Sequence, residues 1–256
     1  MDLIISEPPA GANFWNWLYA NDAKLPHDLR ITSDEPPTDE EEPDQDEINA
    51  HCRELKRMCG YEPPQEYNEF LANVRVTGGS LGRRFPVDEV SPPENITDVF
   101  TGIWKLQFEF VEFPPESVNP LIPIFEIEES GLFCMYLGEP AANGHFPVVE
   151  VYHGAGCRFG VEGGSIKRFL AANLIRRVLE NSSQEISPVD IARRVAQTDP
   201  CSSDYYRLYL ALRDTGDAAG AETALNAART SDVPLGHKAA CEVEPWFLYR
   251  RRTVTA

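Results

Sequence analysis

A glycine-rich stretch is the first place where residue types and spacing suggest chemistry. Gly78, Gly79 and Gly82 precede an arginine pair at 83–84. A Walker-type phosphate loop needs G-x-x-x-x-G-K-[ST] between a strand and a helix, because backbone N–H groups then face the anion. Here the glycines follow a predicted helix, no Lys-Ser or Lys-Thr pair comes next, and Pro86 interrupts any immediate long helix. The pattern favours a turn over a nucleotide site.

Histidines and cysteines form the second candidate, a metal site. The two groups are His51, Cys52 and Cys59, and His145, His153 and Cys157. No paired C-x2-C or H-x3-H unit is present, so neighbouring positions do not supply four ligands. Cys52 falls on the apolar face of a predicted helix, which favours a buried thiol. We expect no metal and no cofactor.

Nucleophilic catalysis is the third possibility. The chain has no G-x-S-x-G elbow, and none of its six cysteines lies in a motif that supplies a base and an orienting group. Acid pairs are common in a chain with 41 carboxylates, so none stands out as a general acid and base. We therefore predict no catalytic residues and no enzyme activity.

The charge distribution bounds the class of partner. The formal net charge is −18, and nine acidic residues with no basic ones lie between Asp34 and Glu47. Such a balance disfavours nucleic acid and anionic membrane as partners and would steer the protein toward a basic surface. Acidity that only keeps the protein soluble explains the composition equally well.

Length and composition indicate a globular chain. A chain of 256 residues can bury one large core or two small ones. No apolar run approaches the ~18–20 residues of a spanning helix, and the sequence MDLIISEPPA does not resemble a signal peptide. The six cysteines are irregularly spaced and do not read as a disulfide framework. We expect a cytoplasmic protein.

The first third of the chain predicts helices and one linker. Residues 12–24 form a short aromatic helix that we expect to dock on the main body, and 32–47 combines prolines with like charges, as flexible linkers do. A helix follows over ~44–58, with Gly60 as its cap. A second helix starts near Pro64 and stops before Gly78. Its predicted apolar stripe is Tyr67, Phe70, Leu71 and Val74.

The middle of the chain changes to the period of strands. Alternating apolar residues predict a strand over ~103–112, and further extended segments follow at 121–127, 132–137 and 148–152. Pro123 indicates an edge strand or a bulge. We expect a turn at 128–131 and a loop at 138–147. Short turns between consecutive strands favour an antiparallel sheet.

Helical periodicity returns near Ser165, a predicted N-cap whose helix has the stripe Ile166, Phe169, Leu170, Leu174 and Val178. Three more helices are predicted. One begins at Ser187-Pro188 and runs through Ala196, and the next is capped by Ser202 or Ser203. The last follows Gly216-Asp217, with Ala218, Ala221, Leu225 and Ala228 on one face. This final pair resembles a single tetratricopeptide-like unit, although simple helix-hairpin packing explains it better.

Several of these segments together resemble the SMI1/KNR4 (SUKH) family. The resemblance covers roughly residues 44–180 and rests on loose, mainly structural motifs. These are Pro64-x-x-Tyr67-x-x-Phe70-Leu71, Thr77-Gly78-Gly79, FPVDEV at 85–90, Leu121-Ile122-Pro123-Ile124, LFCMYL at 132–137, Val148-Val149 with Tyr152-His153, and SIKRFL at 165–170. The chain departs from the family at Glu62-Pro63, where Leu-Pro is usual, at Thr77, where Asn is commoner, and at the turn EESG.

The resemblance implies an α+β fold with a mostly antiparallel sheet flanked by helices. We divide the chain into an aromatic hook and acidic arm, partly flexible, at 1–43, the SUKH-like domain at 44–180, and an all-helical extension at 181–256.

Many bacterial members of the family are immunity proteins, so the resemblance implies a protein-binding module that neutralises a toxin, such as a basic nuclease. The expected partner contacts are Asp39, Glu40, Glu41, Glu42, Glu126, Glu128, Glu129 and Tyr136. The alternative is an intracellular regulatory scaffold, as in fungal members, whose hook, arm and helical tail bind separate proteins. An unfamiliar enzyme is the third class.

Overall fold

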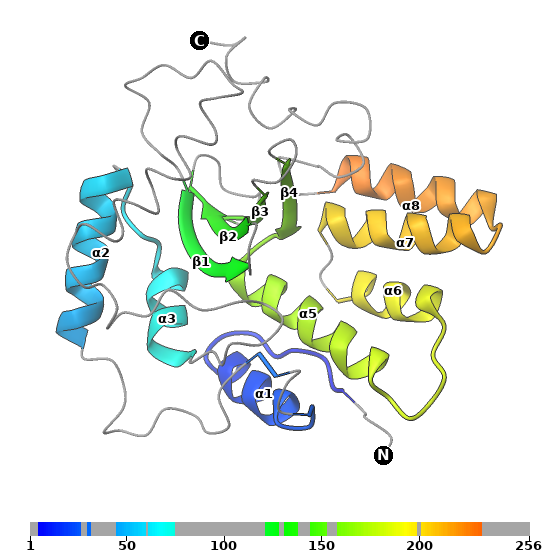
Figure 1. Cartoon of the computed structure of the whole chain (residues 1–256), viewed down its shortest axis with the longest axis horizontal. Helices are drawn as coiled ribbons and strands as arrows, with labels where there is room; N and C mark the ends of the chain where they lie inside the picture. The colour runs from blue at the N-terminus through cyan, green and yellow to red at the C-terminus, as the bar shows by residue number, and fades with distance from the viewer. Residues whose placement is uncertain are drawn as a thin grey trace, which may run out of the picture.

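The computed structural model describes residues 5–26, 30–31, 45–59, 61–74, 121–127, 131–137, 144–152, 158–198 and 201–231 (Figure 1). Its helices are α1 (Asn13–Asp22), α2 (Gln45–Cys59), α3 (Gln65–Asn73), α5 (Ile166–Glu180), α6 (Pro188–Ala196), α7 (Ser202–Asp214) and α8 (Ala218–Thr230). Its strands are β1 (Leu121–Ile127), β2 (Gly131–Tyr136), β3 (Val148–Tyr152) and β4 (Arg158–Gly163).

The four described strands form one antiparallel sheet in the order β1-β2-β3-β4. The chain is therefore a mixed α+β protein, as the strand and helix patterns predict. β1 is an end strand of this described sheet, and its register with β2 shifts between Pro123 and Phe125. Proline has no N–H to donate to a ladder, so its place on an end strand beside a bulge confirms the prediction.

One strand was missed from the sequence. β4 was not predicted, because glycines at 154, 156 and 160 weaken a strand pattern. The weak alternation of Phe159 and Val161 with polar neighbours is the signal that would have found it. Pairing with β3 over five positions, from Tyr152↔Arg158 to Val148↔Gly163, stabilises the strand despite its composition.

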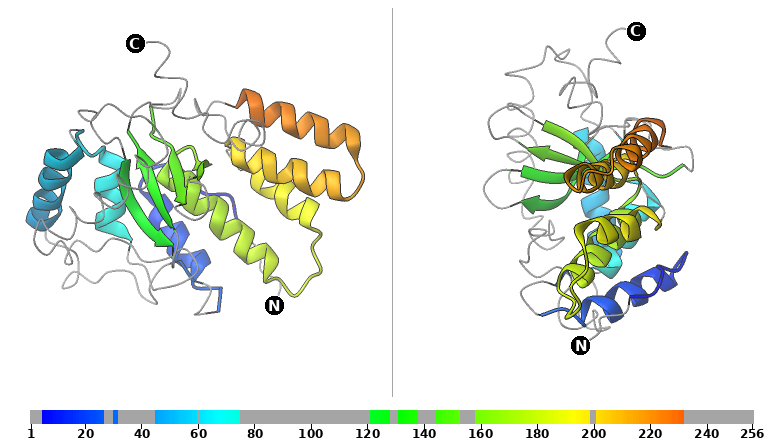
Figure 2. Two further views of the ribbon diagram at one scale, coloured as in Figure 1. Left: turned by 45° about the horizontal axis from the view of Figure 1, so that its top comes forward. Right: turned by 90° about the vertical axis from the view of Figure 1, so that its right-hand side faces the viewer.

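The main hydrophobic core joins the sheet to helices that are far apart in sequence. Side chains from α1, α2, α3, α5 and the strands share one buried cluster. The ribbon views in Figure 2 show α3 and α5 next to the strands. In α3 the predicted stripe is confirmed, since Tyr67, Phe70, Leu71 and Val74 are all buried. Phe70 contacts Phe125 of β1 edge to face, with ring centroids 5.5 Å apart, and such aromatic pairs contribute beyond their buried area.

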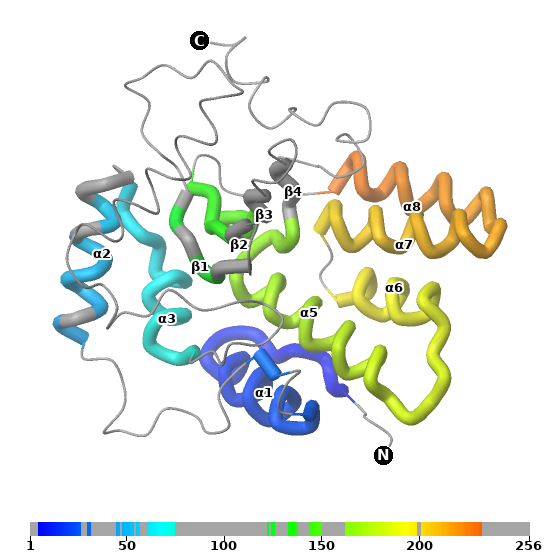
Figure 3. The backbone as a smooth tube through the Cα atoms, in the orientation of Figure 1, coloured from blue at the N-terminus to red at the C-terminus, as the bar shows by residue number. Residues whose placement is uncertain are grey.

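The aromatic N-terminal helix is part of this core. Phe14, Trp15, Trp17 and Leu18 are buried in α1, which packs on α5. The backbone tube shows the preceding segment running along α5 before it enters α1 (Figure 3). Docking on the main body is thus confirmed, and it leaves these four side chains buried inside the chain's own core.

Helix α5 packs closely against the end of β4. Ser165 caps it as predicted, its Oγ accepting the N–H of Arg168 at 3.1 Å, and the five residues of the predicted stripe are all buried. A Cβ added at Gly163 would lie 2.6 Å from Cβ of Phe169 and 2.9 Å from its backbone. Only glycine fits where strand and helix approach so closely.

The helices after residue 187 match the predicted extension with two corrections. α6 spans the predicted residues, with Ser187 as its N-cap. α7 begins after Cys201, so neither Ser202 nor Ser203 is its cap; both lie in the first turn and are buried. Gly216, at φ +83°, makes the turn between α7 and α8, a backbone conformation that glycine adopts without strain.

The buried face of α8 also differs from the prediction. Ala221, Ala224 and Ala228 are buried, whereas Ala218 is exposed and Leu225 is partly buried. Ala218 is the first residue of the helix, and the buried face runs through Ala221 and Ala224, which pack with Leu212 of α7.

Some predictions fall outside the described residues. They are the strand at 103–112, the glycine stretch at 78–83, the motif at 85–90, the acidic segment at 32–44, the cap at Gly60 and the turn at 128–130. Among the helices that the structure describes, none is both long and apolar enough to span a membrane.

Candidate functional site

A chain of buried charges links β4, α5 and α7, and it begins at a bulge in β4. The β3–β4 register passes from Val149↔Val161 to Val148↔Gly163, so Glu162 has no partner residue on β3. A bulge of this kind changes the direction of a side chain and ends regular pairing. Glu162 is only 4% exposed, although it is charged. Its position between a strand and a helix therefore requires a cationic partner.

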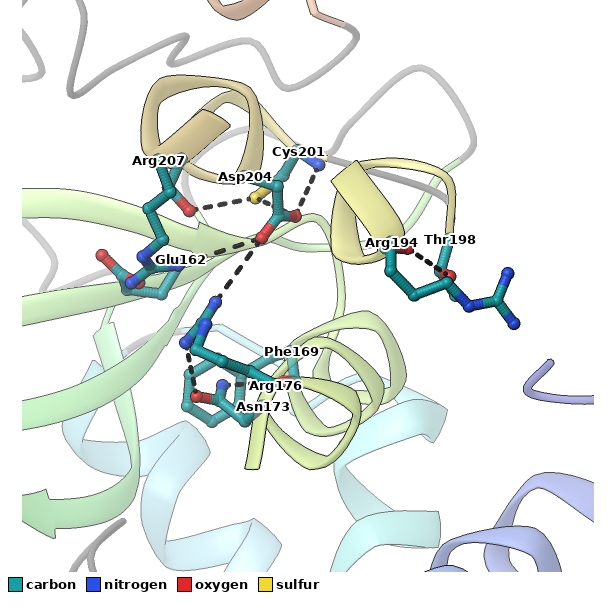
Figure 4. A network of polar contacts seen from close by, with 10 residues as sticks. Glu162, Phe169, Asn173, Arg176, Arg194, Thr198, Cys201, Asp204 and Arg207 are labelled. Carbon is teal, nitrogen blue, oxygen red and sulfur yellow. Dashed lines mark hydrogen bonds and ion pairs between the residues drawn. The ribbon is translucent and has the colours of Figure 1, made fainter. Parts of the chain in front are cut away.

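Arg207 of α7 is that partner. Its Nη2 donates to Oε2 of Glu162, and its Nη1 lies 3.8 Å from Oδ1 of Asp204, one turn earlier on α7. The same Asp204 oxygen lies 3.9 Å from Nη2 of Arg176 on α5. Figure 4 shows these side chains converging from three elements. We call Glu162, Arg207, Asp204 and Arg176 the ion network; its charges alternate in sign and sum to zero.

Asp204 is held in place by the first turn of α7. Its Oδ2 accepts the backbone N–H of Cys201 at 3.0 Å and the thiol of Cys201 at 3.2 Å (Figure 4). A carboxylate at this third helical position returns to the N-cap N–H, as in a capping box. The sequence that starts α7 therefore also sets the position of the central acid of the network.

Burial dominates the electrostatics of the ion network. Loss of water raises the pKa of Asp204, although the N–H of Cys201 and both arginines oppose the shift. For Arg207, burial acts to lower the pKa, but the carboxylates of Glu162 and Asp204 outweigh it and raise the pKa. The pKa of Arg176 is lowered by burial and by the neighbouring charge of Arg207. Both arginines remain charged at neutral pH, because their ordinary pKa is far above it.

Two atoms of the ion network are poorly compensated. Nη2 of Arg176 and Oδ1 of Asp204 are buried, and neither has a hydrogen-bond partner among the described residues. Their separation of 3.9 Å allows Coulomb attraction but exceeds a hydrogen-bond length. A buried polar atom without a hydrogen bond costs free energy, so this interface is held less firmly than its number of charges suggests.

The chemistry available to this site is limited. Burial, together with the adjacent Asp204 carboxylate, raises the pKa of the Cys201 thiol to about 12. A thiol of this kind stays protonated at neutral pH and is a poor nucleophile. The acceptor of the thiol is the Asp204 carboxylate, which is a much weaker base than a thiolate, so proton transfer from the thiol is unfavourable. The arrangement suits electrostatic attachment of α7 better than catalysis.

A second buried carboxylate joins α3 to the start of α5. Glu66 accepts the backbone N–H of Lys167 at 3.0 Å and lies 3.2 Å from Nδ1 of His145. Lys167 in turn donates to Glu69 at 2.7 Å and lies over the ring of Trp15. A carboxylate at a helix N-terminus interacts favourably with the helix dipole. Glu66 therefore stabilises α5 in the place that an external anion would otherwise take.

The structure bears on one of the expected partner contacts. Tyr136 lies at the end of β2 and is 6% exposed, so it is a core aromatic and is not available on the surface. The apolar segment LFCMYL is typical of a buried strand, and the adjacent residues Cys134 and Met135 are both fully buried, so both faces of β2 are covered. Glu126 pairs with Leu132 through its backbone. Its side chain, Glu128, Glu129 and residues 39–42 lie outside what the structure describes.

Of the histidines and cysteines considered as metal ligands, the structure describes the side chains of His51, Cys52 and His145. His51 contacts the hydroxyl of Tyr67 at 3.1 Å, whereas His145 faces Glu66. Cys52 is buried as predicted, and its thiol donates to Asn68 at 2.8 Å. In the described residues no three potential ligands come together. His153, Cys157 and the side chain of Cys59 lie outside this part of the chain.

Comparison with known proteins gives no further assignment: no family model, no curated protein and no solved structure matches the chain.

Sequence reasoning missed the whole ion network. Glu162 was overlooked because its strand was, and the arginines of α5 and α7 looked like ordinary charges on helix surfaces. One signal was available for Asp204, because an acid three residues after a polar N-cap position is typical of a helix start. Nothing in the sequence paired Glu162 with Arg207, which is 45 residues away.

Proposed function

We propose that the protein is a non-enzymatic protein-binding module of the SMI1/KNR4 (SUKH) type, and that it binds and neutralises a basic toxin domain. The observation that carries this proposal is the uneven distribution of charge. The described residues contain 18 acidic and 15 basic side chains, a net of −3 out of −18. The other segments therefore carry −15. Residues 32–44 alone contain seven acids and no base.

Such a concentration of charge has a physical use in recognition. Opposite charge on a partner accelerates association and selects against acidic partners. The folded body needs little of this charge for itself, because Glu162 and Asp204 are buried beside arginines and Glu66 is bound to the N-terminus of α5. The acidic segments, with Glu126, Glu128 and Glu129, are the contacts that we assign to a basic partner.

The order of elements supports the family resemblance at the level of fold. A helix, the short α3 helix, an antiparallel sheet and α5 follow one another along the chain as the motifs imply. The function is transferred by analogy and carries only that weight. The protein is assigned to the cytoplasm on the same grounds.

A regulatory scaffold is the second candidate, and one observation favours it. The α7–α8 hairpin lies beyond the SUKH-like region and presents partly exposed Tyr205, Leu208 and Tyr209. The aromatic hook, however, is not available to a separate partner, because the aromatic side chains of α1 are buried.

An immunity gene is expected to lie directly downstream of its toxin gene, so the test co-expresses the full-length chain with the toxic domain of that upstream neighbour and then purifies both. Neutralising four acids of the arm (Asp39→Asn, Glu40→Gln, Glu41→Gln, Glu42→Gln) is expected to slow association at least tenfold at low salt, with a smaller effect at high salt. The matched control neutralises four exposed acids of the helical region: Glu180→Gln, Glu185→Gln, Asp214→Asn and Glu222→Gln.

The outcomes separate the two candidates. Rescue of growth together with a complex on a sizing column supports the immunity function. Equal slowing in the arm variant and in its control would show that only total charge matters. Failure to rescue growth or to form a complex would overturn the immunity proposal and leave the scaffold.

A further inference from the structure

We propose that the α7–α8 hairpin, residues 201–231, is a cover that opens from β4 and α5 as a unit while the rest of the fold stays closed, and that it separates from them at the ion network. Four features of the structure support this inference: separate apolar clusters, local helix capping, an ionic interface and uncompensated polar atoms.

The apolar contacts of the hairpin are largely internal. Leu212 packs with Ala221 and Ala224, and Tyr206 packs with Ala228. Among the described residues, Val189 of α6 is the one member of these two clusters from outside the hairpin. The main core, by contrast, includes Val195 at the other end of α6. Within the described residues, α6 therefore marks the border between the two sets of apolar contacts.

The hairpin also contains its own local signals for folding. α7 begins with Asp204 bound to the N–H of Cys201, and α8 begins with Asp217 accepting the N–H of Gly220 at 3.0 Å. Gly216 makes the turn between them. None of these contacts depends on β4 or α5, so the hairpin can keep its helices when it moves away.

The interface with the rest of the fold is ionic at its centre. α7 lies beside β4, the last strand of the described sheet (Figures 1 and 4). Glu162 and Arg176 approach Arg207 and Asp204 there from the far side of the interface. Charges that leave such an interface regain their hydration, which offsets much of the attraction they lose. An ionic interface therefore opens more easily than an apolar one of the same size.

The closed state has a further cost. Nη2 of Arg176 and Oδ1 of Asp204 find no hydrogen bond in the described part of the chain, whereas water would satisfy both on opening. Regions with few shared apolar contacts are those that open below the free energy of global unfolding. Opening exposes β4, whose edge is otherwise protected by a helix, as end strands commonly are.

The experiment is native-state hydrogen exchange on the full-length protein with increasing denaturant. In the wild type, amides of α7 and α8 are expected to exchange together through one opening. This opening should have a lower free energy and expose less surface than the opening that exposes α5. Arg207→Met leaves Glu162 buried without its partner, so the same amides should exchange about 100-fold faster while those of α5 change little.

The decisive variant removes both charges of the pair. Glu162→Leu with Arg207→Met replaces the ions by apolar side chains, and hairpin exchange is expected to slow about tenfold relative to the wild type. Arg213→Met is the control, because Arg213 lies on α7 away from the ion network. If Arg207→Met fails to fold, the double variant still gives the required comparison.

Three results would overturn the proposal. The first is wild-type exchange in which α7, α8 and α5 amides share one opening. The second is hairpin exchange as fast in the double variant as in Arg207→Met. The third is an equal effect of Arg207→Met and Arg213→Met.

Discussion

The α+β body and the α7–α8 hairpin are both helical in part, yet they are held together by different forces. The body buries aromatic and aliphatic side chains from α1, α3, α5 and the sheet in one cluster. The hairpin meets the body at β4 through charges that must give up water to be buried. Apolar burial stabilises a fold in proportion to the area removed from water. A buried ion pair adds little net stability, but removing one of its partners is strongly destabilising. The comparison teaches that the two regions should respond differently to mutation and to pH.

The largest effect is expected in the apolar core. Phe70→Ala removes a fully buried ring that contacts Phe125 and should lower the global free energy of unfolding by about 3–5 kcal/mol. Chemical denaturation followed by circular dichroism measures this loss. Gln65→Ala, on the exposed side of the same helix, is the control and should change little. A similar loss of stability in both variants would contradict the assignment of Phe70 to the main core.

A smaller effect is expected from the cap of α8. Asp217→Ala removes the acceptor of the Gly220 N–H and should destabilise the hairpin by about 1 kcal/mol. Hydrogen exchange should place the change in α7 and α8 and leave α5 unaltered. Asp214→Ala, an exposed acid of the same turn, is the matched control. A change spread evenly over the whole chain would mean that hairpin and body form one cooperative unit.

The smallest effect concerns pH. Burial raises the pKa of Asp204 in the folded protein, so the folded state binds this proton more tightly than the unfolded chain does. Burying the ionised Asp204 therefore lowers the free energy of unfolding, and this loss is complete at pH values above the pKa of Asp204 in the folded protein. The loss becomes smaller as the pH falls from that pKa toward the pKa of Asp204 in the unfolded chain. Asp204→Asn can still accept the N–H of Cys201 but does not titrate.

Parallel unfolding curves of wild type and Asp204→Asn test this sign. The wild type should gain stability relative to the variant as the pH is lowered from neutral into the acid range. A relative loss over the same range would show that attraction to Arg207 and Arg176 outweighs the burial of Asp204.

Local and periodic signals in the sequence were sufficient for most elements. The stripe of Tyr67, Phe70, Leu71 and Val74 predicted α3, and Ser165 and Ser187 marked the starts of α5 and α6. These signals work because helix caps and apolar periodicity act within a few residues. Weak or ambiguous signals were insufficient: β4 was not predicted, and α7 was expected to have Ser202 or Ser203 as its N-cap, a position that Cys201 occupies.

The sequence by itself indicated an antiparallel sheet, the apolar faces of α3 and α5, and the acidity outside the described body. Only the tertiary structure decided which charges meet. Glu162 and Arg207 lie 45 residues apart and join because a bulge in β4 faces α7. Tertiary structure also decided that Tyr136 is buried. Periodicity reports which residues share a face, but pairing of distant charges and the covering of a second face depend on how the elements pack.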